Sequence, residues 1–127
     1  MSLTLRIHAG EYAVCRLAPH DPPPSWVTQA AGFTSITRTA DELSIVCAAG
    51  GVPAAVKHDG GWALLELVGP FPFEAVGILS SVLTPLAAAR VSCLTIATHD
   101  TDYVLVKAGT LAAARAALER AGHRFVE

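Results

Sequence analysis

Hydrophobic and polar residues alternate in short runs along most of this chain, and such alternation predicts β-strands. Leu3, Leu5 and Ile7 alternate with polar neighbours, which predicts a half-buried strand over residues 3–8. Other apolar runs are bounded by turn-forming residues such as Gly, Pro and Asp, and they predict further strands over residues 12–17, 33–38, 43–48, 62–68, 91–98, 103–107 and 123–126. The pattern therefore indicates a protein built largely of strands.

Helical spacing occurs in three places. A helix is expected over residues 73–89, with Pro85 kinking its last turn. Its apolar stripe is Leu79, Val82, Leu83 and Leu86. A second helix is expected between Thr110 as cap and Gly122, and a short third one from 26 to about 31.

The sequence of strand, polar turn and strand occurs twice. Residues 35–46 align with residues 95–106 without a gap at an offset of 60, which sets Glu42 opposite Asp102. Residues 12–19 similarly echo residues 62–70. A period near half the chain length predicts two related units, and we expect them at residues 1–60 and 61–127, with the boundary turn at residues 59–61.

The second half has the order βαββαβ. With short connections and right-handed crossovers, this order predicts a ferredoxin-like unit, in which an antiparallel sheet carries two helices on one face. The first half is a degenerate copy whose second helix and last strand are missing or shrunken after Ala48. We expect residues 3–8 to form a hairpin with residues 12–17 and to take the place of that last strand. The expected fold class is α+β, with two tandem ferredoxin-like units, the first truncated or rearranged.

The composition excludes several classes of protein. Of 127 residues, 52% are hydrophobic and 16% charged, which is typical of a well-buried globular chain. The net charge is −2 and the basic residues are scattered, so nothing predicts nucleic-acid binding. The most apolar run, residues 75–89, is too short to span a membrane, and the N-terminus lacks the apolar core of a signal peptide. We therefore expect a soluble cytoplasmic protein whose Cys15, Cys47 and Cys93 are buried free thiols.

An ordered set of residues in the second half resembles a known family. The set comprises Trp62, Gly69-Pro70-Phe71, Phe73, Gly77-Ile78-Leu79, Pro85-Leu86-Ala87, Val91-Ser92, residues 98–106 and Ala121-Gly122-His123. It resembles the small tandem ACT-domain proteins, which are related to the regulatory domains of aspartate kinases and to cytosolic arginine sensors. The resemblance is strong over residues 62–123 and weaker over residues 38–46. It implies two ACT-type units and an amino-acid-binding regulatory protein, not an enzyme, with no cofactor.

The chemistry of an amino acid suits particular parts of this chain. Its carboxylate needs free backbone N–H groups, which a helix start near Gly77 presents. Its ammonium group needs a carboxylate, and Asp102 and Asp100 stand in the second polar turn. By the resemblance, the ligand lies between the two units and contacts Gly77, Ile78, Thr98, His99, Thr101 and Asp102, with Ser44 and Ile45 on a strand edge of the first half as the opposite wall. Specificity for arginine is not implied, because the turn carries His99 and Thr101 where the arginine sensors have aromatic side chains.

Several of these polar and aromatic residues also have a purely structural interpretation. Asp100 and Asp102 are common turn residues whose side chains cap backbone N–H groups. The remaining histidines, His8, His20, His58 and His123, are interpreted as surface or strand-end residues. The large aromatic residues Trp26, Trp62, Phe71 and Phe73 are interpreted as packing residues, although Phe71 lies near the expected ligand.

Three functions are therefore kept apart. The first is an amino-acid sensor that acts through a protein partner or through its own oligomer. The second is a structural or oligomerisation module without a ligand, because ferredoxin-like sheets have open edges that pair readily. The third is a metal-dependent hydrolase that uses His99, Asp100 and Asp102 as ligands. The sequence leaves open the amino acid, the partner, the oligomeric state and whether one or two sites function.

Overall fold

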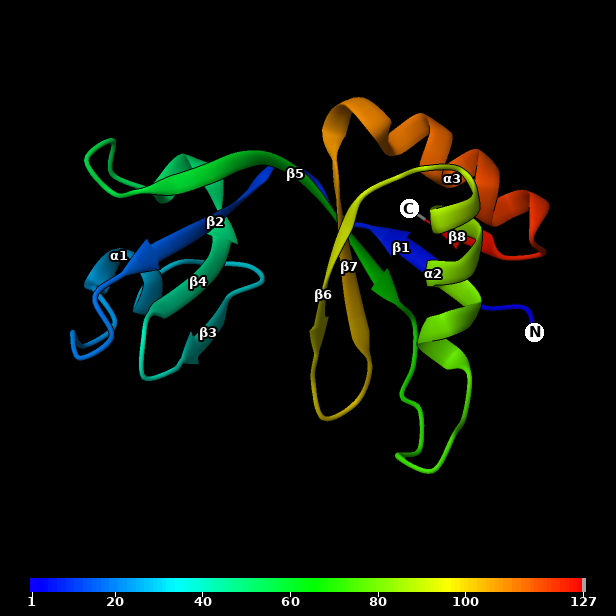
Figure 1. Cartoon of the computed structure of the whole chain (residues 1–127), viewed down its shortest axis with the longest axis horizontal. Helices are drawn as coiled ribbons and strands as arrows, with labels where there is room; N and C mark the ends of the chain where they lie inside the picture. Colours follow the sequence, from blue (N-terminus) through cyan, green and yellow to red (C-terminus); the bar gives the residue numbers. More distant parts are fainter. Residues whose placement is uncertain (127) are drawn as a thin grey trace. The chain divides into compact units, whose positions relative to one another are not determined.

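A computed structural model describes residues 1–126 of the chain. They form two compact units, each with a hydrophobic core of its own. The N-terminal unit is Gly10–Trp62. The C-terminal unit combines Met1–Ala9 with the residues from Ala63 onward. Figure 1 shows the elements of both units in sequence colours.

The N-terminal unit is a four-stranded antiparallel sheet with one short helix. Its elements are β2 (Tyr12–Leu17), α1 (Ser25–Thr28), β3 (Ser35–Arg38), β4 (Leu43–Ala48), the 3-10 helix η1 (Ala49–Gly51) and the start of β5 (His58–Leu67). The strand order is β3-β4-β2-β5. Alternate residues of β2 and β4 point inward and pack with Val27 of α1 to form the core. No second α-helix lies between η1 and β5, so this unit is a truncated version of the βαββαβ order.

The fourth strand of this unit is the start of β5, whereas residues 3–8 were expected in that place. The start of β5 pairs with β2, through Tyr12↔Trp62 and Cys15↔His58. Residues 59–61 therefore lie inside a strand and not in a boundary turn. The β2–β5 pairing has a register shift, and Gly61 has a positive φ of +76°. A glycine is expected at position 61, because an irregular strand needs a residue that tolerates this conformation.

The C-terminal unit is a five-stranded sheet with two helices. Its elements are β1 (Thr4–Ile7), the end of β5, α2 (Ile78–Ala88), β6 (Cys93–Ala97), β7 (Asp102–Lys107), the 3-10 helix η2 (Ala108–Thr110), α3 (Leu111–Arg120) and β8 (Arg124–Val126). The strand order is β6-β7-β5-β1-β8. The expected α+β architecture is confirmed.

The first strand of the chain lies in the C-terminal unit, so its expected hairpin with residues 12–17 is wrong. β1 pairs antiparallel with β5, through Leu5↔Leu67, and parallel with β8, through Leu5↔Phe125. It is thus inserted between the first and the last strand of the βαββαβ unit. Leu3 and Leu5 are buried in the core of this unit, which explains why the strand belongs here.

Helices α2 and α3 pack together over one face of this sheet (Figure 1). The stripe on α2 is confirmed, since Val82 and Leu86 are fully buried while Leu79 and Leu83 pack against the same core. The helix begins at Ile78, five residues later than expected. Gly77, with a φ of +86°, is in the left-handed region and cannot continue a helix backwards.

The two β-hairpins correspond at a different offset from the expected one. In the N-terminal unit Arg38 pairs with Leu43, and in the C-terminal unit Ala97 pairs with Asp102, each around a four-residue turn. The offset is therefore 59, and Glu42 corresponds to Thr101 and not to Asp102. The alignment by sequence similarity, at an offset of 60, is therefore wrong by one residue.

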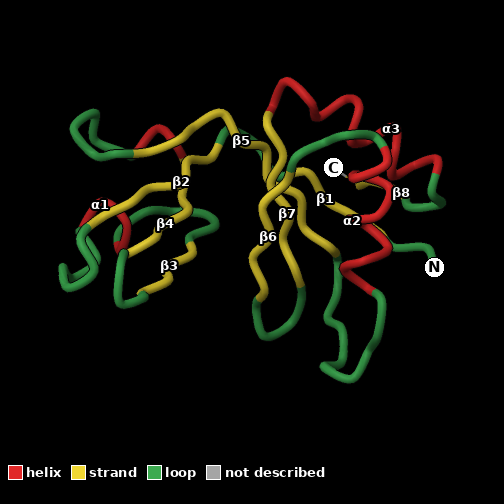
Figure 2. The backbone as a smooth tube through the Cα atoms, in the orientation of Figure 1, coloured by secondary structure: helices red, strands yellow, loops and turns green. Residues whose placement is uncertain are grey.

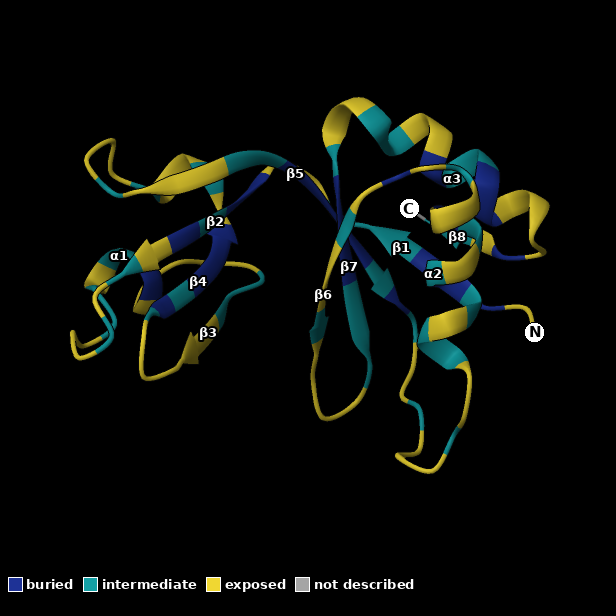
Figure 3. Ribbon diagram, viewed as in Figure 1, coloured by how far each residue is buried: buried dark blue, intermediate teal, exposed yellow. Residues whose placement is uncertain are grey.

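The polar residues of interest lie outside the cores. Within the C-terminal unit, the loop before α2 and the β6–β7 turn are drawn as loops in Figure 2 and are mostly exposed in Figure 3. His123 precedes β8, a strand end as expected, but it is buried and not at the surface. Within residues 1–126, none of the helices has the length and apolar character needed to cross a membrane.

Candidate functional site

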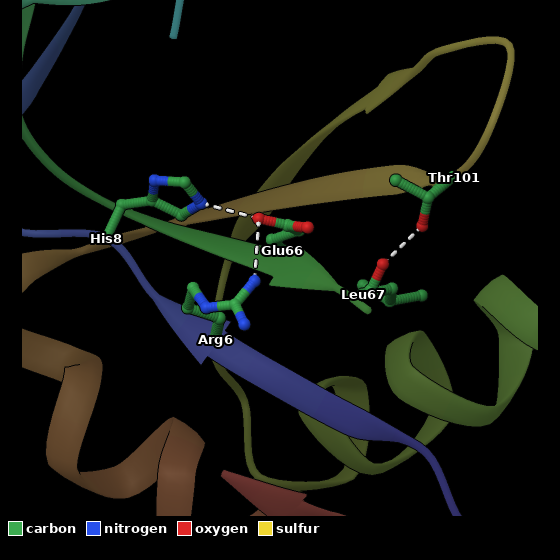
Figure 4. A network of polar contacts seen from close by, with 5 residues as sticks. All are labelled: Arg6, His8, Glu66, Leu67 and Thr101. Atoms are coloured by element: carbon green, nitrogen blue, oxygen red, sulfur yellow. Dashed lines mark hydrogen bonds and ion pairs between the residues drawn. The ribbon is translucent and has the colours of Figure 1, made fainter. Parts of the chain in front are cut away.

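The loop between β5 and α2 is fastened to the turn between β6 and β7. The N–H of Phe71 donates to the carbonyl oxygen of Asp100 at 2.9 Å, and the hydroxyl of Thr101 donates to the carbonyl of Leu67 (Figure 4). Gly69 lies so close to the turn that a Cβ atom there would stand 3.1 Å from the Asp100 carbonyl oxygen. The two segments therefore form one preorganised frame.

A cavity of about 250 Å³ lies within this frame. It is bounded by the loop, by the start of α2 and by the turn. Its lining residues are Phe71, Pro72, Phe73, Ala75, Ile78, Ala97, Thr98, His99, Asp100, Thr101 and Asp102. We call it the α2 pocket. Five of the eight residues expected to bind a ligand line it, namely Ile78, Thr98, His99, Thr101 and Asp102.

The start of α2 is a source of hydrogen-bond donors beside this pocket. Gly77 is the N-cap residue and no side chain caps the helix. The first backbone N–H groups of a helix have no partner inside the helix and carry the positive end of its dipole. Ile78, the first helical residue, lines the pocket. The sixth expected residue, Gly77, thus stands at the edge of the site through its backbone.

The carboxylate of Asp102 is the charged group that the protein leaves unpaired in the pocket. Asp102 is half-buried at the start of β7, and its side chain has no hydrogen bond or ion pair with any residue from 1 to 126. His99 and Asp100, by contrast, pair with each other at 2.8 Å and are largely exposed. No lysine or arginine is among the residues that line the pocket. The pocket is therefore acidic on the side of the turn.

The two threonines of the turn serve its structure. The Thr98 hydroxyl donates to the carbonyl of Thr101 at 3.0 Å and accepts the N–H of Thr101 at 3.2 Å. The Thr101 hydroxyl is engaged with the Leu67 carbonyl. Both side chains line the pocket, but their hydrogen bonds hold the turn and the loop in place.

The two expected residues of the first half belong to the N-terminal unit. Ser44 and Ile45 lie on β4, which pairs with β2 on one side and β3 on the other. This strand is therefore not an edge, contrary to the expectation. The side chain of Ile45 is fully buried in the core of its unit, whereas Ser44 is half-buried.

Phe73 lines the pocket, whereas the sequence pattern had indicated a residue that packs in the core. It is 76% exposed, and its ring meets the His99 ring edge-on with the centroids 5.0 Å apart. A phenylalanine between Pro72 and Glu74, outside the apolar stripe of α2, was the available indication that this ring does not enter the core. Phe71, in contrast, packs against the core as well as lining the pocket.

A second polar cluster lies on neighbouring strands of the same unit (Figure 4). The Glu66 carboxylate accepts from His8 Nε2 at 2.8 Å and lies 3.5 Å from a guanidinium nitrogen of Arg6. Burial, with a smaller effect of the Glu66 charge, raises the pKa of nearby Tyr103 above its ordinary value. These residues explain the charged position in the otherwise apolar strand β5, because Glu66 is directly opposite Arg6 in the β1–β5 register.

The turn does not assemble a recognisable metal centre. Among residues 1–126, no three His, Cys, Asp or Glu side chains come together in a way that could hold a metal ion. His99 and Asp100 instead pair with each other.

Comparisons with known proteins add the following. An ACT-domain family model matches residues 57–120, and a second model, described as an N-terminal domain, matches residues 10–55. No curated protein matches the sequence.

Solved structures match over nearly the whole chain. A protein from Agobacterium tumefaciens is 37% identical, with a TM-score of 0.93 over 99% of this chain and 93% of its own. A Vibrio cholerae protein of unknown function, described as a possible transport protein, is 23% identical, with a TM-score of 0.76 over 95% of this chain and 91% of its own. The ligand-free regulatory subunit of aspartate kinase from Thermus thermophilus is 12% identical, with a TM-score of 0.65 over 95% of this chain and 99% of its own. The last two show a shared fold.

Proposed function

Because this chain belongs to the ACT-domain family, we propose that it is a regulatory protein that binds a free amino acid in the α2 pocket and catalyses no reaction. Family membership and the fold shared with aspartate kinase regulatory subunits support a regulatory, ligand-binding domain in general. The amino acid as ligand is our proposal. We also propose a cytoplasmic location, which the free thiols of all three cysteines favour.

The unpaired carboxylate of Asp102 beside an uncapped helix start is the observation that carries this proposal. A free amino acid has one group of each charge on the same carbon atom. Its carboxylate fits the backbone N–H groups at the start of α2, and its ammonium group fits Asp102. Ile78, at the helix start that would bind the carboxylate, and Asp102, which would bind the ammonium group, line the same cavity of about 250 Å³.

The remaining expected residues have proposed roles of different kinds. Gly77 permits close approach to the helix start, and Ile78 provides an N–H donor and an apolar wall. Thr98 and Thr101 hold the turn that carries Asp102. His99, with Phe73, covers the mouth of the pocket, where the ligand side chain would lie. Ser44 and Ile45 lie in the N-terminal unit and are given no role in the α2 pocket.

We propose that the output of binding is a change in association. A ligand shifts an equilibrium between two states only by its difference in affinity for them. We propose that an occupied α2 pocket changes the contact of this chain with a protein partner or with a second copy.

The first test is a thermal-unfolding screen of the whole protein against the twenty amino acids. A ligand at about 100 times its dissociation constant adds about 2.7 kcal/mol to stability, which is a shift of several degrees for a chain of this size. For each hit, the amino-acid amide and the α-hydroxy acid are tested, since the first lacks the carboxylate and the second lacks the ammonium group. We expect both analogues to lose the shift. No response to any amino acid at 10 mM contradicts the proposal.

A structural module is the second candidate, and one observation favours it. Within the described residues β6 pairs only with β7, and its residues Cys93–Ala97 carry no charge and include the exposed Leu94. Edge strands of this kind are templates for pairing with another chain. Sedimentation analysis that shows a concentration-dependent dimer, together with no response in the amino-acid screen, would select this function.

A further inference from the structure

The turns of the two β-hairpins are built with the same hydrogen bonds. In the C-terminal unit, the N–H of Thr98 donates to the carbonyl of Thr101 at 2.8 Å. In the N-terminal unit, the N–H of Thr39 donates to the carbonyl of Glu42 at 2.9 Å. The hydroxyl of each threonine also accepts the N–H of the residue three positions later. Thr39 and Thr98 are therefore equivalent, and their neighbours can be compared position by position.

The residue just before each threonine differs between the units. In the C-terminal unit it is Ala97, whose small side chain lines the α2 pocket. In the N-terminal unit it is Arg38. One guanidinium nitrogen of Arg38 donates to the carbonyl of Pro19, and the other donates to the carbonyl of Asp21 at 3.0 Å. The side chain thus reaches from the hairpin to the loop between β2 and α1.

That loop is the counterpart of the loop that frames the α2 pocket. Each loop joins the strand before the first helix of its unit to that helix, β2 to α1 and β5 to α2, and each is bonded to the hairpin of the same unit. In the C-terminal unit, backbone and hydroxyl donors make the junction and leave an open cavity. In the N-terminal unit, the Arg38 side chain makes the bonds between the hairpin and the loop. Arg16, on β2, separately donates to the carbonyl of Asp41 in the hairpin turn at 2.9 Å.

The chemistry of the junction in the N-terminal unit is specific. Two carbonyl oxygens accept from the two terminal nitrogens of one planar guanidinium group, a geometry that a single ammonium group does not reproduce. The N-terminal unit lacks a long helix whose start could bind the carboxylate of an amino acid, because α1 has only four residues and therefore only a small dipole.

We propose that the carbonyls of Pro19 and Asp21 form a guanidinium-binding site, and that the chain's own Arg38 occupies it permanently. The place that a free ligand takes in the C-terminal unit is closed in the N-terminal unit by a residue of the protein. The equivalence to a ligand site rests on the proposed function. The guanidinium site itself does not, and its test is independent of any amino acid.

The test removes the occupant and supplies it as a free molecule. Arg38→Ala and the wild-type protein are titrated with methylguanidinium chloride, with methylammonium chloride at equal ionic strength as the reference. The ¹³C carbonyl shifts of Pro19 and Asp21 and the midpoint of thermal unfolding are measured. We expect saturable shifts of both carbonyls and a higher melting temperature with methylguanidinium than with methylammonium, in Arg38→Ala only.

The control is Arg124→Ala, which removes the same charge from the C-terminal unit, where the guanidinium donates to the Thr4 hydroxyl. It should behave as the wild type does. Equal responses of Arg38→Ala and the wild type, or shifts that do not saturate, overturn the proposal. If Arg38→Ala does not fold, Arg38→Gln serves in its place. A guanidinium response without any hit in the amino-acid screen would keep this site and refute only the amino-acid function.

Discussion

The Nε2 atom of His123 donates a hydrogen bond to the carbonyl oxygen of Ser81 at 2.9 Å. Ser81 lies four residues before Pro85, which has no N–H to offer to that carbonyl in the helix. The Nδ1 atom of His123 accepts the N–H of Leu3 at 3.0 Å, so the ring is the neutral tautomer with its proton on Nε2. One buried side chain thereby joins α2, the start of β8 and the segment before β1.

We expect His123→Ala to destabilise the protein by about 2–4 kcal/mol, because it leaves a buried N–H and a carbonyl without partners and removes a packed ring. Pro85→Ala restores an N–H for the Ser81 carbonyl, so His123→Ala should cost less in that background. Urea unfolding of the four proteins of this double-mutant cycle measures the difference. The exposed His20→Ala should change stability by less than about 0.5 kcal/mol. Additive effects of His123→Ala and Pro85→Ala would show that the two residues do not share the Ser81 carbonyl.

Asp102→Asn should weaken binding of any amino acid found in the screen by about 1–3 kcal/mol, since it removes a charged acceptor for the ammonium group. The folded state should be retained, because no bond of the Asp102 side chain within residues 1–126 is lost. Isothermal titration calorimetry gives the affinity. Asp41→Asn, in the turn of the N-terminal unit, is the matched control and should bind as the wild type does. An unchanged affinity of Asp102→Asn would remove Asp102 from the site.

Gly69→Ala should lower stability by about 1–3 kcal/mol and weaken ligand binding as well. A Cβ atom at this position would lie 3.1 Å from both the Asp100 carbonyl oxygen and the Phe71 side chain, so the loop or the turn must move. Gly109→Ala is the control, since its Cβ meets nothing within 4 Å. Thermal unfolding of both variants measures the effect. Equal melting temperatures of Gly69→Ala and Gly109→Ala would show that the loop and the turn can move apart without loss of stability.

The thiols of the N-terminal core should make stability fall at high pH. Burial raises the pKa of Cys15 from 9.0 to about 12, and it also raises the pKa of Cys47. Above pH 9 the unfolded chain loses these protons while the folded chain keeps them, so unfolding releases protons. The free energy of unfolding should be unaffected below pH 8 and should fall above pH 9, by up to about 1.4 kcal/mol per pH unit for each thiol. For Cys15 the fall should continue to about pH 12.

Urea unfolding of the wild type and of Cys15→Ala at pH 7 to 10.5 tests this slope, which should be smaller in the variant. Identical slopes would exclude Cys15 as a source. At pH 8 both thiols should also resist a thiol reagent until the protein unfolds, because the reactive thiolate is suppressed and buried.

The amino-acid sequence by itself determined the strands, the apolar stripe of α2 and the presence of a helix start and of an acidic turn. These features depend on local periodicity and on residues close together in the chain, such as Gly77 with Ile78 and Thr98 with Thr101. The tertiary structure alone decided where the first strand pairs, because Leu5 finds its partners Leu67 and Phe125 far along the chain. It also decided which acid is free. Asp100 and Asp102 have the same side chain and lie two residues apart, but His99 pairs with Asp100, whereas the Asp102 carboxylate stays unpaired in the pocket. Hydrogen bonds between distant residues, such as His123 with Ser81, leave no periodic pattern, and only the folded chain reveals them.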